Sequence, residues 1–99
     1  MVTVVISQKP LREFWEKHPN GMEALSAWYT FVGECDWGKH ADVVRDFNTA
    51  DYVRDGRYVF NIRGNNYRVV ARIHFPTRTV FIRFVGTHAQ YDKIDAGSI

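Results

Sequence analysis

The chain has 99 residues, of which 45% are hydrophobic and 24% charged, and its formal net charge is +2. This length suits one domain spanning residues 1–99, and the apolar content is sufficient for a core, which argues against intrinsic disorder. No apolar run approaches the roughly 20 residues that cross a bilayer, and the first residues lack a basic leader with a cleavage site. We therefore expect a cytoplasmic protein without a membrane partner, and the lone Cys35 cannot form an internal disulfide.

The first part of the chain predicts one strand followed by two helices. Residues 3–6 form a short β-branched run typical of an edge or central strand. Apolar residues at helical spacing predict an amphipathic helix over 8–18, and a second apolar stripe predicts a helix that runs to Gly33. Asn20 and Glu23 match a capping box at the start of this second helix. The two helices would form a hairpin that packs on a sheet through its aromatic residues.

The segment 34–57 has a weaker pattern. Residues 37–39 predict a loop, 41–47 predict a short helix, and 48–56 return to turn-forming residues. Neither this segment nor the rest of the sequence contains an internal repeat or a low-complexity linker.

Three strand-like runs follow, and the first two are joined by Gly64 and Asn65. This pair suits a two-residue type II′ hairpin turn, which fixes how the two strands align. The cross-strand pairs that result are Arg63 with Asn66, Asn61 with Arg68, and Val59 with Val70.

The connection to the third strand is predicted as the four residues 76–79. It gives the cross-strand pairs Phe75 with Val80, Arg72 with Arg83, and Arg68 with Thr87. Alternation then assigns the apolar residues to the face that the helices cover. These are Tyr58, Phe60, Ile62, Tyr67, Val69, Ala71, Ile73, Phe75, Val80, Ile82 and Phe84. The opposite face carries Asn61, Arg68, Arg72, Arg83 and Thr87.

Positive charge is concentrated in the second half of the chain. Residues 52–99 contain eight Lys or Arg against three Asp or Glu, whereas residues 1–51 contain five against eight. Two arginines that face each other across strands repel, so Arg72 opposite Arg83 favours a bound anion such as phosphate, which a planar guanidinium grips at two points. The alternatives are a solvated edge, or neutralisation by acidic residues of the preceding segment. Those residues are Asp42, Asp46, Asp51 and Asp55.

A polar turn ends the sheet at Gly86, where the chain can bend. Thr87 is placed to cap a final helical turn that carries His88 and Tyr91 on one side and also contains Asp92. The histidine can exchange a proton near neutral pH, and the tyrosine can stack on a base or donate a proton. Beside the arginines of the sheet, these groups suggest a site that holds and cuts an RNA backbone.

Four segments of this region together resemble the HigB family of bacterial toxins. They are 58–65, 67–71, 82–88 and 91–92, with the sequences YVFNIRGN, YRVVA, IRFVGTH and YD. The length of the chain and its helix-helix-sheet order fit the resemblance over the remainder.

The resemblance implies a RelE-like fold, an α+β domain in which a mainly antiparallel twisted sheet carries two N-terminal helices on one face and a short C-terminal helical turn. It implies an mRNA interferase, an endoribonuclease that cuts messenger RNA on the translating ribosome and thereby inhibits translation. The implied protein partner is a HigA-like antitoxin with a helix-turn-helix domain, and operator DNA would be contacted only through that antitoxin.

The polar cluster of the family corresponds to five positions of this chain, which are Asn61, Arg68, Arg83, His88 and Tyr91. The expected catalytic residues are Arg68, Arg83, His88 and Tyr91, and the expected RNA-binding residues are Asn61, Arg63, Arg72 and Lys93. We expect no metal and no cofactor. The expected reaction is attack of an RNA 2′-OH on the neighbouring phosphate, which leaves a 2′,3′-cyclic phosphate and a 5′-OH.

Other functional classes are open on the sequence alone. A non-catalytic RNA- or ribosome-binding module would need the basic face but neither His88 nor Tyr91, and a pure protein-interaction domain would have no salt-dependent RNA affinity. The histidines and Cys35 have no paired spacing typical of a zinc site. A Cys35 nucleophile is disfavoured because the adjacent Glu34 and Asp36 would raise the pKa of its thiol.

Overall fold

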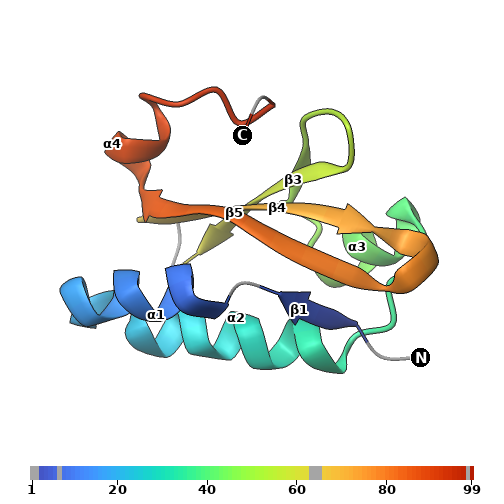
Figure 1. Cartoon of the computed structure of the whole chain (residues 1–99), viewed down its shortest axis with the longest axis horizontal. Helices are drawn as coiled ribbons and strands as arrows, with labels where there is room; N and C mark the ends of the chain where they lie inside the picture. Colours follow the sequence, from blue (N-terminus) through green and yellow to red (C-terminus); the bar gives the residue numbers. More distant parts are fainter. Residues whose placement is uncertain (1–2, 7, 63–65, 98) are drawn as a thin grey trace.

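The computed structural model describes residues 3–6, 8–62, 66–97 and 99. Within these residues the elements follow the order that Figure 1 shows. The helices are α1 (Gln8–Lys17), α2 (Met22–Glu34), α3 (His40–Asp46) and α4 (His88–Tyr91), and short 3-10 turns occupy Pro19–Gly21 and Phe75–Thr77. The strands are β1 (Val4–Ile6), β2 (Asp51–Tyr52), β3 (Arg57–Ile62), β4 (Tyr67–His74) and β5 (Thr79–Thr87).

The described strands form one sheet in the order β1-β5-β4-β3-β2. Strand β1 lies parallel to β5 at one edge, and the other neighbouring pairs are antiparallel. Helices α1 and α2 lie on one side of the sheet, while α4 and the C-terminal segment lie on the other (Figure 1). The predicted α+β class is therefore confirmed, with two N-terminal helices on one face of a mainly antiparallel sheet. Among the described residues, no helix has both the length and the apolar character needed to cross a membrane.

Most of the predicted helices and strands are present, with small differences at their ends. Strand β1 is an edge strand, α1 ends one residue before the predicted end at position 18, and α3 falls within one residue of the predicted 41–47. The prediction of a capping box at the start of the second helix is wrong, because α2 has Gly21 at its N-cap and no side-chain cap hydrogen bond. The short strand β2 lies where turns were predicted, and it pairs with β3.

The register of the β3 and β4 hairpin is confirmed where the structure describes it. Val59 pairs with Val70, and Asn61 pairs with Arg68. The predicted turn at 64–65 and the position of Arg63 lie outside the described residues.

The predicted register between β4 and β5 is wrong. Ile73 pairs with Val80, because residues 75–78 make the connection through a 3-10 turn that ends at Arg78 with a φ of 53°. Arg72 consequently lies opposite Phe81 rather than Arg83. A bulge then shifts the register by one residue, so that Arg68 lies opposite Gly86.

The bulge also changes which side chains reach the core. The alternation was correct up to Ile82, which joins the large cluster beneath the helices together with Tyr58, Phe60 and Val80. Past the extra residue the faces exchange, and Phe84 packs in a second cluster on the opposite side of the sheet. That second cluster contains Val59, Val70, Ala96, Phe84, Tyr91, Ile94 and Ile99. The face predicted to be polar therefore has an apolar centre that the C-terminal segment covers.

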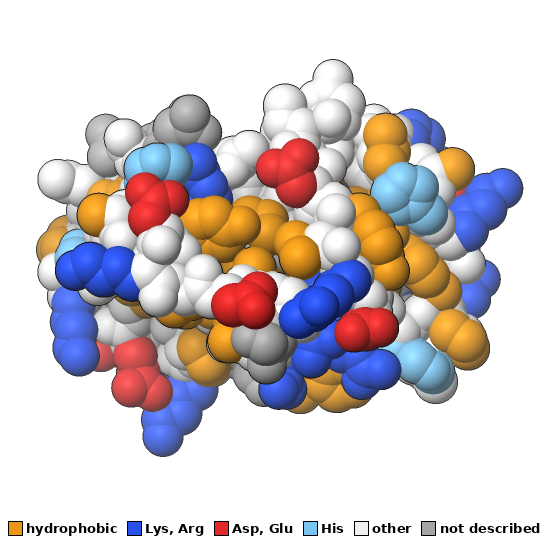
Figure 2. All heavy atoms as spheres, turned by 90° about the horizontal axis from the view of Figure 1, so that it is seen from above, with side chains coloured by type: hydrophobic (Ala, Val, Ile, Leu, Met, Phe, Trp, Pro, Cys, Tyr) orange, Lys and Arg blue, Asp and Glu red, His pale blue; other side chains and the backbone are white. Residues whose placement is uncertain are grey.

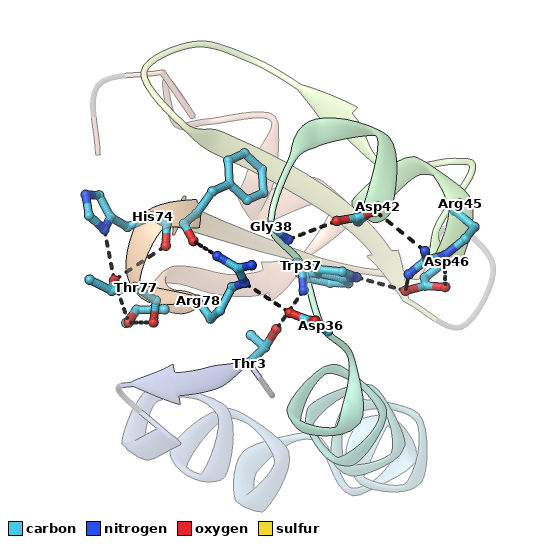
Figure 3. A network of polar contacts seen from close by, with 12 residues as sticks. Thr3, Asp36, Trp37, Gly38, Asp42, Arg45, Asp46, His74, Thr77 and Arg78 are labelled. Atoms are coloured by element: carbon cyan, nitrogen blue, oxygen red, sulfur yellow. Dashed lines mark hydrogen bonds and ion pairs between the residues drawn. The ribbon is translucent and has the colours of Figure 1, made fainter. Parts of the chain in front are cut away.

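The indole of Trp37 links the core to helix α3. Its side chain is fully buried, and its ring stacks parallel to that of Phe60 at 6.0 Å between centroids. The indole N–H donates a hydrogen bond of 2.9 Å to Asp46, whose other carboxylate oxygen is 3.2 Å from Nε of Arg45 (Figure 3). The Arg45 guanidinium, and after it the Trp37 N–H, hold the pKa of Asp46 at about 2, below its ordinary 3.8.

We expect Asp46→Asn to lower the free energy of unfolding at neutral pH by about 1 kcal/mol, a value reduced for the solvent exposure of Arg45. Because the folded-state pKa is lowered, this stability is present above pH 3.8 and is lost as the pH falls toward about 2. The amide oxygen keeps an acceptor for Trp37, so the substitution tests the charge. Urea unfolding of both proteins over this pH range measures the difference, and a difference that persisted at the lowest pH would contradict the assignment.

Candidate active site

Helix α4 is fixed to the end of β5 by a complete capping box. The Thr87 side chain accepts a hydrogen bond of 3.2 Å from the Gln90 backbone N–H, and the Gln90 side-chain oxygen accepts one of 2.9 Å from the Thr87 backbone N–H. These reciprocal bonds pair two backbone donors that a short helix would otherwise leave unpaired. The predicted helical turn after Thr87 is confirmed, and it holds His88 and Tyr91 at a defined position above β4.

Gly86 provides space for this arrangement rather than a bend. It has no left-handed φ and lies inside β5. A Cβ atom at this position would lie 2.5 Å from the Phe84 ring and 2.9 Å from the Gln90 side-chain oxygen. The absence of a side chain therefore lets Phe84 and the Gln90 cap occupy the surface beside Arg68, the cross-strand partner of Gly86.

The centre of the site is the side chain of Arg68, which is 7% exposed. Its Nη2 lies 2.7 Å from Nδ1 of His88, its Nη1 donates to the Tyr67 carbonyl oxygen at 3.3 Å, and its Cζ lies 5.8 Å from the centroid of the Tyr91 ring. A guanidinium can only donate, so Nδ1 of His88 is the acceptor and the proton of the neutral ring is on Nε2. The structure thus brings together three of the four predicted catalytic side chains, Arg68, His88 and Tyr91.

Asp92 extends this cluster on the far side of the imidazole. Its Oδ2 lies 3.5 Å from Nε2 of His88, at the i,i+4 spacing of one helical turn. The sequence placed Asp92 on the turn but assigned it no role. The spacing from His88 was the signal that could have identified it, since a carboxylate four residues after a histidine on a helix faces the ring.

The fourth predicted catalytic residue, Arg83, does not join this cluster in the structure. It is the extra residue of the β5 bulge, between Ile82 and Phe84, and it is exposed. Among the described residues, the Arg83 side chain makes no hydrogen bond, ion pair or ring contact. The expected cross-strand pair of Arg72 and Arg83 is therefore absent, because Arg72 lies opposite Phe81 and both arginines are exposed.

The predicted RNA-binding residues are dispersed. Asn61 lies across from Arg68, but its side-chain amide donates to the Thr49 carbonyl oxygen at 3.4 Å. Arg72 is exposed and donates to the Asp55 carbonyl oxygen at 3.3 Å. Lys93 is exposed just after α4, and Arg63 lies outside the described residues.

Several other arginines have structural roles. Arg54 pairs with Asp95 and Arg57 donates to Ile99, so both hold the C-terminal segment against the sheet. Arg78 binds Asp36 at 3.0 Å and stabilises the connection between β4 and β5 (Figure 3). The positive charge of the second half of the chain is thus spread over the molecule. Figure 2 accordingly shows an apolar strip across the face that carries α4, with basic, acidic and histidine side chains around it.

The acidic residues of the preceding segment were one possible source of ion pairs for the site arginines. Asp42 and Asp46 both bind Arg45. Asp55 contacts Arg57 and Arg72 through its backbone carbonyl oxygen. The carboxylate that lies near the buried guanidinium cluster is Asp92, on the histidine.

Cys35 does not have the properties of a nucleophile. Burial, followed by the hydrogen bond and the charge of Asp46, raises the pKa of its thiol from 9.0 to about 12. The thiol lies one residue past the end of α2 and donates to the Phe31 carbonyl oxygen at 3.2 Å. Within the described ranges, no three His, Cys, Asp or Glu side chains are grouped as metal ligands.

Comparison with known proteins gives a consistent result. Residues 22–94 match the family described as HigB toxin, the RelE-like toxic component of a toxin-antitoxin system. The chain is 34% identical over 92 residues to the mRNA interferase HigB of Escherichia coli O6:H1, covering 91% of this chain and 89% of that protein. It is also 34% identical over 94 residues to the mRNA interferase toxin HigB of Escherichia coli K12, covering 93% and 90%. The mRNA interferase HigB of Shigella flexneri matches to the same extent.

Proposed function

The chain belongs to the HigB family of RelE-like toxins, and on this premise we propose that it is an endoribonuclease that cuts messenger RNA on the translating ribosome. The observation that carries the proposal is the contact of 2.7 Å between the buried Arg68 and His88, with Tyr91 beside them. A fixed guanidinium, an imidazole and a phenol can supply the charge stabilisation and the proton transfer by which a phosphodiester is cut without a metal.

In the proposed reaction the RNA 2′-oxygen bonds to the adjacent phosphorus, and the bond from phosphorus to the 5′-oxygen breaks. The 2′-OH loses a proton and the leaving 5′-oxygen gains one, so the products are a 2′,3′-cyclic phosphate and a 5′-OH. Arg68 stabilises the negative charge that develops on the phosphoryl oxygens. In the free protein Nδ1 of His88 accepts from Arg68, and the ring proton is on Nε2, which faces Asp92. When the guanidinium turns to the phosphate, Nδ1 is free to take up or to give one of the two protons, and Asp92 stabilises the protonated ring.

Tyr91 and the exposed cations have supporting roles in this proposal. The Tyr91 ring stacks on a base of the substrate or its hydroxyl assists proton transfer. Arg83 supplies a second guanidinium for the phosphate backbone, and Lys93, Arg72, Asn61 and Arg63 contact RNA around the cleavage position.

A toxin of this family has an antitoxin partner and messenger RNA as its target. We propose further that the antitoxin is HigA-like, with a helix-turn-helix domain through which alone the complex binds operator DNA. Action on the translating ribosome would take place in the cytoplasm.

The test is to induce the chain in bacteria and to determine the 5′ ends of the transcripts and the chemistry of those ends. We expect new ends within translated regions, with 5′-OH on one fragment and 2′,3′-cyclic phosphate on the other. Co-expression of the antitoxin should suppress them. Growth arrest without new transcript ends would contradict the proposal, and 5′-phosphate ends would contradict the mechanism.

A further inference from the structure

A groove of about 420 Å³ lies between helix α1 and the C-terminal segment, next to the end of β5. Helix α1 contributes Phe14 and Lys17, and His18 follows directly after it. The segment that begins with α4 contributes Gln90 and Lys93. Figure 1 shows α1 and α4 on opposite sides of the same end of β5. The volume lies in the range of about 300–1,000 Å³ that is typical of pockets for small organic molecules.

The charges of the groove favour an anionic occupant. Lys17 and Lys93 are exposed on its two walls, on elements far apart in the sequence. Glu13 is the carboxylate among the described lining residues, and its Oε1 lies 4.0 Å from Nζ of Lys9. Among the described residues neither Lys17 nor Lys93 forms an ion pair with Glu13, and phosphates on both sides of a nucleotide would neutralise the two lysines.

The remaining surface of the groove suits a nucleobase. Phe84 of β5 contributes its ring to the lining, and His18 contributes an imidazole that stacks on Phe14 at 4.3 Å between centroids. Bases stack on such rings without regard to sequence. The side-chain oxygen of Gln90 is engaged in the capping box. Among the described residues the side-chain amide nitrogen of Gln90 has no partner, so this nitrogen can donate a hydrogen bond to the ligand.

The groove lies next to the candidate active site, because the helical turn that carries His88 and Tyr91 also contributes Gln90 to the groove wall. His88 and Tyr91 lie on α4, Gln90 lies between them, and Lys93 follows two residues later. A strand whose cleavable phosphate contacts His88 can thus enter the groove over the same helical turn. We propose that this groove binds a nucleotide of the RNA strand that flanks the cleavage position, with Lys17 and Lys93 on its phosphates; the inference rests on the proposed function.

The test compares two variants that each lose two positive charges. Lys17→Gln combined with Lys93→Gln removes the cations of the groove, whereas Arg12→Gln combined with Lys39→Gln removes exposed cations outside it. The probe is a labelled 2′-O-methyl oligouridylate, which lacks the attacking hydroxyl and is not cut, and its dissociation constant is measured over a range of salt concentrations. Cleavage of ribosome-bound RNA by each protein is measured in parallel.

We expect the groove variant to bind the probe about tenfold or more weakly and to lose about 1.4 from the slope of log K against log salt, corresponding to two phosphates of a single strand. Its KM for cleavage should rise while kcat stays near that of the unmodified protein. Affinity and slope equal to those of the control variant would overturn the inference and leave the proposed function standing. Unchanged RNA binding with weaker antitoxin binding would overturn it in favour of an antitoxin surface. If the unmodified protein cuts no RNA, the proposed function fails, and the probe measurement still decides whether the groove binds RNA.

Discussion

Replacing Arg68 with alanine is expected to lower the rate constant of RNA cleavage by about 100- to 1,000-fold, the loss measured when one preorganised donor is removed from a site of developing negative charge. Arg68 is 7% exposed and the Tyr67 carbonyl oxygen holds its guanidinium in place, so only the N–H donated to His88 has to turn to the phosphate as charge develops. Single-turnover cleavage of ribosome-bound messenger RNA measures the effect.

Two companion variants separate chemistry from folding. Arg68→Lys keeps the charge but loses the planar fork, so we expect cleavage between that of the unmodified protein and that of the alanine variant. Arg12→Ala, on the exposed face of α1, removes a guanidinium outside the site and should leave cleavage unchanged. Circular dichroism and urea unfolding determine whether each variant is folded. Cleavage by a folded Arg68→Lys and a folded Arg68→Ala at the unmodified rate would exclude Arg68 from the mechanism.

The register between β3 and β4 was predicted correctly because the residues that determine it lie in the two strands and in the short connection between them. A two-residue turn at 64–65 predicted the register with Asn61 opposite Arg68, and the alternation of apolar residues on both strands agrees with it. The same alternation could not identify the bulge in β5, because an added residue leaves both the apolar residues and the polar ones in plausible positions. Its effect was to exchange the faces of Phe84 and Val85.

The site was predictable where it depends on one turn and not where it depends on the bulge. The spacing of Thr87, His88 and Tyr91 specified a capped helical turn, and the structure contains it. The pairing of Arg72 with Arg83 required a correct connection at 75–78, where a left-handed Arg78 held by Asp36 alters the register. Contacts such as that between Arg78 and Asp36 join residues far apart in the chain, and no local pattern indicates them.

Replacing His88 with alanine is expected to abolish cleavage while RNA binding persists, and this separates the nuclease from a module that blocks translation by occupancy. Removal of a positioned general acid or base costs about 100- to 10,000-fold, whereas phosphate binding depends on cations that this change leaves in place. Tyr91→Phe keeps the ring beside Arg68 and removes only the hydroxyl, so a rate close to that of the unmodified protein would assign Tyr91 to stacking.

The control for His88→Ala is His74→Ala, at the opposite end of β4, where the imidazole binds Thr77. It should leave both binding and cleavage unchanged. Rate constants are compared at saturating protein, and binding is measured with the uncleavable 2′-O-methyl probe. If His88→Ala and Tyr91→Phe both arrest growth and bind RNA as the unmodified protein does, and no transcript is cut by any of the three, occupancy is the function. The cluster of Arg68, His88 and Asp92 would then serve to fix α4 on the sheet, and its disruption would appear as a loss of stability alone.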